Sequence, residues 1–433
     1  MKNIGNIIKK ERIKQKITQK ELAKDICSTS YLSKIESGKQ IPQDEVKHAL
    51  INRLQINLEH YIDIDEEQFL KENYPLIKNA IMNNDQIQIK KLLDYFKSMN
   101  LEFSNIENFY TFNLRLLRLY LMIDEPMEME NAVSLLNAFK TMEESLNDRQ
   151  KFFYYENYSL YCINTKQYQS ALSYLEKAGL LISKIQLSVG EKADYYYFLS
   201  TVYHKLHRTL NAIEYAEQAL KLFTELKYPQ QMVNCYIRIG LSHIQNGHYH
   251  YALDIFDNCY NICAENNLKK NYGVIYQNLG YIYALEGDSR GAISYYRKSL
   301  AVKKCPLRIL ITIHSMVKEY SKLNSTTSVE TWCHKGLNLI KDHKIEKEAQ
   351  EYVYHFRIYK MLHQLSDFDE ALFAEAIDFF NNTQNYKNVH KYAILAGSLL
   401  SKREEYKKAT EYYQKATEAM YAMKNIKAWE DLS

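Results

Sequence analysis

The sequence predicts an all-α protein with a small N-terminal domain and a long array of helical hairpins behind it. Only 12 Gly and 5 Pro interrupt 433 residues, 46% of which are hydrophobic. Such a composition favours nearly continuous helix. Two patterns refine the prediction: helix-capping residues between positions 18 and 38, and small residues that recur every 37 to 42 positions beyond about residue 70. We therefore expect domains at 1–65 and 66–433.

The first element is a bent pair of short helices. Thr18 and Glu21 have the spacing of a capping box, which starts a helix by bonding two amides that lack a helical partner. Ser28 can cap a second helix, which Gly38 ends, and the residues between the helices allow only a tight turn. This arrangement is typical of a helix-turn-helix.

The second helix has two distinct faces. Residues advance about 100° each, so Leu32 and Ile35 share an inward face while Ser30, Lys34 and Ser37 point outward. A small, polar and basic face fits the DNA major groove, which is about 12 Å wide. The same face is also compatible with an ordinary solvated helix, and this alternative stays open on the face alone.

The order of residues resembles the Cro and repressor type of helix-turn-helix. The resemblance implies a phosphate contact for Gln19, a structural pair between Arg12 and Glu36, and a backbone position for Tyr31. It implies base-edge contacts for Thr29, Ser30 and Lys34.

Net positive charge is concentrated in the N-terminal part of the chain. Residues 1–58 contain 12 Lys or Arg and 6 Asp or Glu, a net +6, whereas the whole chain is +4, so the remainder is near −2. Because phosphate neutralisation supplies most non-specific DNA affinity, double-stranded DNA is the expected partner of this region. A lysine-rich terminus that only aids solubility is the alternative.

The rest of the chain repeats itself. Small residues near the start of each second helix align at Ala132, Ala171, Ala212, Ala252, Ala292, Val329, Ala371 and Ala409. Leu279-Gly280 precedes its alanine by thirteen and twelve residues, and Tyr296 follows it by four. This register is that of a tetratricopeptide repeat, in which small residues let two helices approach and aromatic residues fill the gaps. We expect eight repeats, with a ninth hairpin between Glu72 and Met99, wound into a right-handed superhelix.

In such an array the first helix of each hairpin lies on the concave face, where an extended peptide can bind. Side chains that donate and accept hydrogen bonds are expected there, with Arg where a carboxylate must be met. The inward positions predict peptide-binding side chains, of which Arg238 and Asn278 are expected to be exposed: Arg118, Asn157, Tyr197, Asn234, Arg238, Gln277, Asn278 and Tyr281. Each of these residues could also be an ordinary solvated groove residue.

The sequence does not indicate a metal site or a catalytic site. Cys259 and Cys263 lie one helical turn apart, but the repeat register makes Cys259 a packing residue, and no second pair has metal-ligand spacing. There is no glycine-rich phosphate loop, nucleophile elbow or kinase signature. We expect no enzyme activity, no metal and no cofactor.

The sequence also predicts the location of the protein. The absence of an 18-residue apolar run and of a signal-peptide pattern predicts a cytoplasmic protein that does not bind a membrane.

The turn Asp25-Ile26-Cys27-Ser28 lacks the usual glycine and is one residue short. With the repeats behind it, this turn resembles the RRNPP quorum-sensing family, named for Rap, Rgg, NprR, PlcR and PrgX, and most closely its NprR-like and PlcR-like regulators. The resemblance implies a homodimeric transcription regulator whose repeats bind a short signalling oligopeptide. Two alternatives stay open: a scaffold that sequesters a response-regulator protein, and a phage arbitrium-type regulator of the same build.

Overall fold

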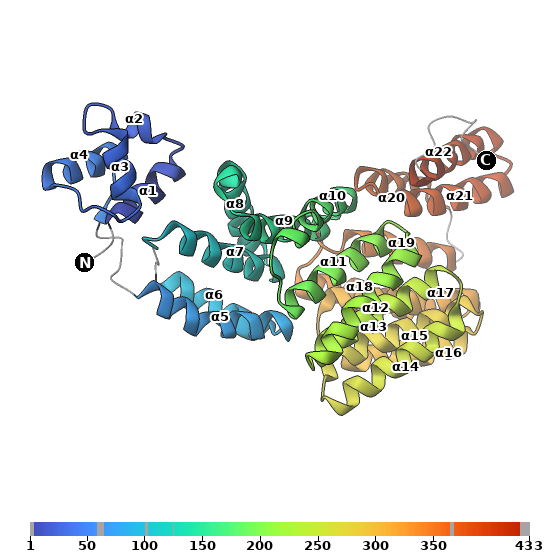
Figure 1. Ribbon diagram of the computed structural model, residues 1–433. Helices are drawn as coiled ribbons and strands as arrows, with labels where there is room; N and C mark the ends of the chain where they lie inside the picture. The colour runs from blue at the N-terminus through green and yellow to red at the C-terminus, as the bar shows by residue number, and fades with distance from the viewer. Residues whose placement is uncertain (1–3, 59–64, 100–102, 124, 364–367, 425–433) are drawn as a thin grey trace. The chain divides into compact units, whose positions relative to one another are not determined.

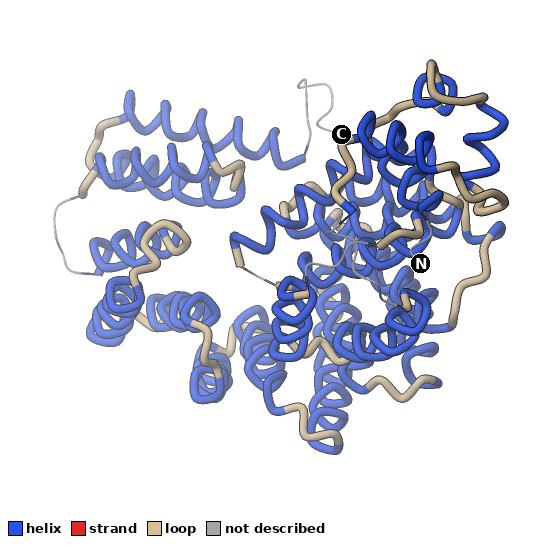
Figure 2. The backbone as a smooth tube through the Cα atoms, turned by 90° about the vertical axis from the view of Figure 1, so that its left-hand side faces the viewer, coloured by secondary structure: helices blue, strands red, loops and turns tan. Residues whose placement is uncertain are grey.

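The computed structural model describes residues 4–58, 65–99, 103–123, 125–363 and 368–424, and these residues contain helices and no strand (Figures 1 and 2). The all-α prediction is therefore confirmed. The chain divides into two compact units, residues 1–266 and 267–433, which are described separately. None of the described helices is both long enough and apolar enough to cross a bilayer.

Four short helices form the head: α1 (Ile4–Lys14), α2 (Gln19–Ala23), α3 (Thr29–Glu36) and α4 (Asp44–Leu54). The capping box is present at α2, where Thr18 accepts from the Glu21 amide and the Glu21 carboxylate accepts from the Thr18 amide. The head has its own core, in which Ile8, Leu32 and Leu50 are fully buried. The predicted boundary at residue 65 adjoins positions 59–64, outside the described residues, and stays a prediction.

The other eighteen α-helices of the described residues form nine consecutive hairpins, in agreement with the predicted eight or nine. In chain order the pairs are α5 (Glu66–Met82) with α6 (Gln86–Ser98), α7 (Ile106–Met122) with α8 (Pro126–Met142), α9 (Asp148–Asn164) with α10 (Tyr168–Gly179), α11 (Val189–Lys205) with α12 (Thr209–Glu225), α13 (Pro229–Gln245) with α14 (Tyr249–Glu265), α15 (Tyr272–Leu285) with α16 (Ser289–Val302), α17 (Pro306–Lys322) with α18 (Thr326–His343), α19 (Gln350–His363) with α20 (Glu370–Asn382), and α21 (Tyr386–Lys402) with α22 (Tyr406–Lys424).

Small residues and aromatic rings interlock within the hairpins, as the repeat register predicts. A Cβ added at Gly280 would lie 2.7 Å from ring carbons of Tyr296, and one at Gly240 would lie 2.8 Å from the Phe256 ring. Ala292 is fully buried at the start of α16. Only a residue without a side chain lets the two helices approach this closely.

One position of the predicted register is wrong. Ala371 is exposed, whereas Phe373, the fourth residue of α20, is fully buried. The fourth residue is also the buried one in α12, α14, α16 and α22, where it is alanine. The alignment selected a small residue for this position, but this hairpin fills it with a phenylalanine.

Candidate functional site

The recognition helix α3 is built as the sequence predicts. Ser28 caps it by accepting from the Tyr31 amide, 3.1 Å away. Leu32 and Ile35 are fully buried beneath it. Thr29, Ser30 and Lys34, the predicted base-reading residues, are all exposed. Their side chains are thus available to a partner, and their role in DNA binding stays a prediction.

A charged cluster holds α1, α2 and α3 together. Arg12 donates from Nε to Glu36 Oε1 at 2.6 Å and from Nη2 to Glu36 Oε2 at 2.8 Å, which confirms the predicted pair. Gln19 donates to Glu36 Oε2 at 2.7 Å, so the amide of the predicted phosphate contact is bonded inside the head. Tyr31 is half-buried, and its hydroxyl accepts from the Gln43 amide at 3.3 Å.

The shortened turn has a physical basis. Asp25 has φ of +61°, a left-handed conformation in which glycine is the usual residue. Aspartate tolerates this region better than most residues do because its short polar side chain can bond locally. The amides of Ile26 and Cys27 both donate to the Ala23 carbonyl and close the turn.

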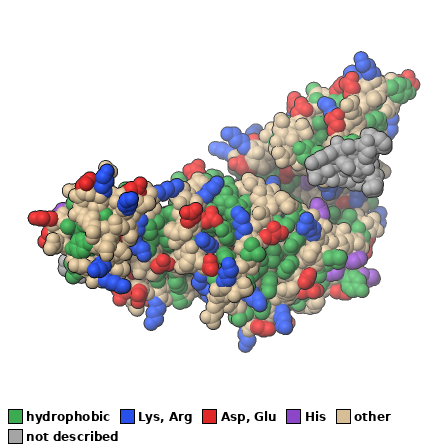
Figure 3. Space-filling view, turned by 45° about the horizontal axis from the view of Figure 1, so that its top comes forward, with side chains coloured by type: hydrophobic (Ala, Val, Ile, Leu, Met, Phe, Trp, Pro, Cys, Tyr) green, Lys and Arg blue, Asp and Glu red, His purple; other side chains and the backbone are tan. Residues whose placement is uncertain are grey.

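Basic side chains on the head are dispersed. In Figure 3 the lysines and arginines of the head, at the left of the view, are spread over the surface with acidic residues among them. Lys20, Lys24 and Lys34 are exposed around the helix-turn-helix. On this face of the head, basic and acidic side chains are therefore interspersed.

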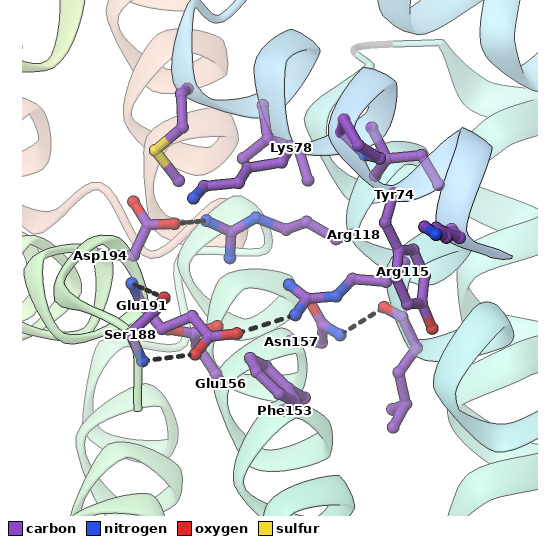
Figure 4. A pocket seen from close by; sticks show the side chains of 16 residues that line it. Tyr74, Lys78, Arg115, Arg118, Phe153, Glu156, Asn157, Ser188, Glu191 and Asp194 are labelled. Carbon is purple, nitrogen blue, oxygen red and sulfur yellow. Dashed lines mark hydrogen bonds and ion pairs between the residues drawn. The ribbon is translucent and has the colours of Figure 1, made fainter. Parts of the chain in front are cut away.

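The repeat region contains a cavity of about 550 Å³, a size typical of ligand pockets (Figure 4). Its walls are the first helices of four successive hairpins, α5, α7, α9 and α11, together with Ser188, which precedes α11. Two of the predicted peptide-binding residues, Arg118 and Asn157, line it. The first helices thus enclose a site inside the first compact unit.

Arg118 is the most unusual side chain of the cavity. It is 8% exposed, its guanidinium lies 4.3 Å from the centre of the Phe198 ring, and Nη2 is 3.6 Å from Asp194 Oδ2. Its Nε and Nη1 atoms are buried and have no hydrogen-bond partner. Buried donors are nearly always satisfied, so two open donors on one cation mark a place where a ligand can bind.

Two carboxyl groups face this arginine region (Figure 4). Glu156 is 6% exposed, and its Oε1 has no hydrogen-bond partner. Burial raises the pKa of Glu156 to about 8, against the opposing effect of Arg118. Burial also raises the pKa of Asp194, again against Arg118. The cavity therefore holds Glu156 as a neutral acid near pH 7, able to donate a hydrogen bond.

A third acidic group is fully engaged. Glu191 accepts from Arg115 at 2.9 Å and from Arg149 at 2.8 Å, and its other oxygen accepts from the Ser188 amide. Burial opposes ionisation, but the Ser188 amide and the two arginines outweigh it and lower the pKa of Glu191. Arg115 also stacks 4.3 Å from the Phe153 ring centre. This cluster fixes α7, α9 and α11 around the cavity.

The other predicted groove residues differ in their exposure and in their hydrogen bonds. Asn157 is 3% exposed and donates to the Leu114 carbonyl at 2.9 Å, so part of its amide supports the fold. Tyr197 is half-buried on α11. On α13, Asn234 bonds to Gln230 and Gln231, while the Nε of Arg238 is buried without a partner.

Three more predicted residues lie on α15, in the second unit. Gln277 accepts from Lys303 at 3.1 Å and from Thr312 at 2.7 Å, and it donates to Ser315. Tyr281 is exposed, but Asn278 is only 9% exposed. The expectation of an exposed side chain is therefore wrong for Asn278, because the first helices pack closely enough to cover its inward position. Arg118 and Asn157 are covered in the same way.

Sequence reasoning missed the acidic residues of the cavity. Glu156 precedes the predicted Asn157, and Asp194 lies one helical turn before Phe198, on the same face of α11. A carboxylate at such a position, in helices rich in buried aromatic residues, is the signal that would have indicated them. Among the residues that the structure describes, no three His, Cys, Asp or Glu side chains gather as metal ligands.

Comparisons with known proteins agree with this architecture. Residues 8–60 match a helix-turn-helix family, and residues 193–224 and 274–304 match a tetratricopeptide repeat family. The transcriptional activator NprA of Geobacillus stearothermophilus is 27% identical, over 94% of this chain and 100% of its own length. The response regulator aspartate phosphatase I of Bacillus subtilis is 24% identical, over 82% of this chain and 90% of its own length.

A solved structure shares the fold. NprR in complex with its cognate peptide NprX superposes with a TM-score of 0.60 at 21% identity, over 82% of this chain and 100% of that one. The helix-turn-helix family matches the head, the tetratricopeptide family matches the repeats behind it, and the similarity to NprA extends along nearly the whole length. The predicted resemblance to the RRNPP family is therefore confirmed.

Proposed function

We propose that this protein is a peptide-responsive transcription regulator of the cytoplasm. Its head binds promoter DNA as part of a homodimer, and its repeats bind a short signalling peptide that switches the activity. The cavity between α5, α7, α9 and α11, with two open donors on Arg118, is the observation that carries the peptide part. The names of two relatives, a transcriptional activator and a quorum sensor solved with its cognate peptide, support the assignment.

The chemistry of the cavity suits a peptide. Backbone carbonyls and a carboxylate accept hydrogen bonds, and Arg118 offers Nε and Nη1 for them. Glu156, neutral near pH 7, adds an acid hydroxyl that does not repel a carboxylate. Phe153 and Ile77 supply apolar walls for side chains. Such a site combines charge recognition with burial of apolar area.

Calorimetric titration with short peptides encoded near the gene tests peptide binding. A bound peptide is expected to lose at least about tenfold in affinity in Arg118→Met, since a hydrogen bond to a charged group contributes about 1.5–3 kcal/mol. Arg290→Met, which removes an exposed arginine of α16, is the matched control and should bind normally. Equal affinity in both variants would place the peptide outside this cavity.

Fluorescence anisotropy with promoter DNA tests the head. Lys34→Ala should lower affinity for the operator more than for random DNA, because Lys34 is exposed on the predicted base-reading face of α3. Lys9→Ala, on α1, should weaken both DNAs alike and reduce the salt dependence. Equal losses on both DNAs for Lys34→Ala would remove this lysine from the base-reading role.

A response-regulator protein is the second candidate partner, favoured by the similarity to response regulator aspartate phosphatase I over 82% of the chain. Incubation of the full chain with phosphorylated response regulators distinguishes the possibilities. A stoichiometric complex without faster loss of phosphate indicates a scaffold, and faster loss indicates a phosphatase. If neither occurs while a peptide alters DNA affinity, the first proposal stands alone.

A further inference from the structure

The second unit contains a half-buried cluster of basic and aromatic side chains separate from the sites above. His314 and Lys318 lie one turn apart on α17, Tyr359 lies on α19, and Lys391 lies on α21. All three helices are first helices of consecutive hairpins (Figure 1). The cluster therefore draws its side chains from the first helices of three neighbouring hairpins.

The aromatic part of the cluster is tightly ordered. The rings of His314 and His355 stack with centroids 4.1 Å apart and planes 8° apart. His355 Nδ1 is hydrogen-bonded to the Tyr392 hydroxyl. Burial lowers the pKa of both histidines, so this stack is neutral in the folded protein. The Nε2 atom of His314 is buried and has no hydrogen-bond partner.

Lys391 contacts two tyrosines of the cluster. Its Nζ lies 3.4 Å from the hydroxyls of both Tyr359 and Tyr392, and 4.7 Å from the centre of the Tyr392 ring. The Tyr359 hydroxyl accepts from this ammonium group, so its own proton remains available to another acceptor. Burial, together with the charges of Lys318 and Lys387, lowers the pKa of Lys391 to about 8.

The two lysines of the cluster have no ion-pair partner among the described residues. None of the described carboxylates forms an ion pair with Lys318 or Lys391. The charge of the neighbouring Glu319 partly offsets the lowering of the Lys318 pKa by burial. The Glu319 carboxylate is itself engaged elsewhere, since it accepts from Ser289 at 2.7 Å and from Lys322 at 2.8 Å. This contrasts with the first unit, where Glu191 and Asp194 balance the arginines. Burial and the charge of Lys318 both disfavour the charged form of Lys391, and an anion bound beside the two lysines would offset both effects.

We propose that Lys318, Lys391 and the Tyr359 hydroxyl form an oxyanion-binding site, with the open Nε2 of His314 beside it. A carboxylate and a phosphate share the required chemistry: compact negative charge and several acceptor oxygens. The site does not depend on the peptide function proposed above, because an inorganic ion suffices to occupy it.

Thermal unfolding of the full chain tests the site, in increasing phosphate or acetate with chloride of equal ionic strength as the reference. Because a ligand that binds only the folded state stabilises it, the midpoint should rise with the oxyanion. A rise with both anions identifies a site open to carboxylates, and a rise with phosphate alone identifies a phosphate site. No rise with either would overturn the proposal.

Lys391→Met supplies the decisive comparison. In chloride its midpoint should equal or exceed that of the wild type, since it removes a half-buried cation that Lys318 and Lys387 repel. Its response to the oxyanion should disappear, with affinity lowered about tenfold or more. Lys408→Met, which removes a lysine paired with Glu370 and Glu405, is the matched control and should keep the response.

A second variant keeps the test decisive if Lys391→Met fails to fold. Tyr359→Phe removes one hydroxyl and no charge, and it should weaken oxyanion binding while leaving the chloride midpoint nearly unchanged. An unaltered oxyanion response in a folded Lys391→Met protein, or in Tyr359→Phe and Lys318→Met together, would overturn the assignment.

Discussion

The substitution Arg12→Ala should unfold the head selectively. Arg12 makes two charged hydrogen bonds to Glu36, at 2.6 and 2.8 Å, and a third to the Ile17 carbonyl at 2.9 Å. Glu36 is only 3% exposed, so the substitution leaves a buried carboxylate with Gln19 as its remaining side-chain partner. Removing one partner of a buried ion pair typically costs about 3–5 kcal/mol.

That cost is comparable with the whole stability of the head. At about 0.05–0.15 kcal/mol per residue, a domain of roughly 55 residues is stable by about 3–8 kcal/mol. Hydrogen exchange should therefore show loss of protection in α1 to α4 of Arg12→Ala, with α9 to α14 unchanged. DNA binding should be lost in parallel.

A double substitution distinguishes the cost of leaving a buried charge unpaired from the cost of lost packing. In Arg12→Met/Glu36→Met no charge stays buried, and apolar replacement of a buried pair is often neutral, so protection in the head should return. If Arg12→Ala costs less than about 1 kcal/mol, the pair behaves like an exposed salt bridge and the reasoning fails.

Two further predictions concern the repeats. The folded chain keeps the Glu156 proton up to about pH 8, whereas the unfolded chain loses it near 4.5, so stability should fall between these values by about 1.4 kcal/mol per pH unit. Urea unfolding of Glu156→Gln should show a correspondingly flatter pH profile, and an unchanged profile would contradict the neutral-acid assignment. Gly280→Ala should cost about 1–3 kcal/mol, because its Cβ meets Tyr296 at 2.7 Å and the Ala292 carbonyl oxygen at 3.0 Å. Gly190→Ala, whose Cβ has no neighbour nearer than 3.7 Å, should be neutral or stabilising by about 0.5–1 kcal/mol; equal losses in both variants would point to a backbone effect instead of crowding.

Local patterns predicted the parts of the fold that depend on near neighbours in sequence. Thr18 and Glu21 act three residues apart, and Leu32 and Ile35 share a face by helical geometry alone. The packing of Gly280 against Tyr296 also followed from one repeat register. Each of these features requires only helix periodicity or a spacing within one hairpin.

The charged part of the cavity could not be predicted in this way. Arg115 and Glu191 are 76 residues apart and meet because different hairpins stack. Periodicity gives the face on which each residue lies, but it does not give the side chain opposite it on another helix. The same limit explains why Arg118 and Asn157 were placed in an open groove, whereas packing between first helices buries them.

The burial of unsatisfied groups suggests how the repeats respond to a ligand. A ligand shifts an equilibrium only by its differential interaction with the two states. Nε and Nη1 of Arg118 lack hydrogen-bond partners in the described structure. A ligand that accepts hydrogen bonds from them binds favourably only in the conformation in which the four helices enclose the cavity. Those walls come from four different hairpins, α5, α7, α9 and α11, so binding favours one spacing of these hairpins over others. A dimer that reads half-sites about 34 Å apart is sensitive to small changes in such spacing. Under the proposed function, Arg118 is thus the side chain through which a bound peptide would control DNA binding.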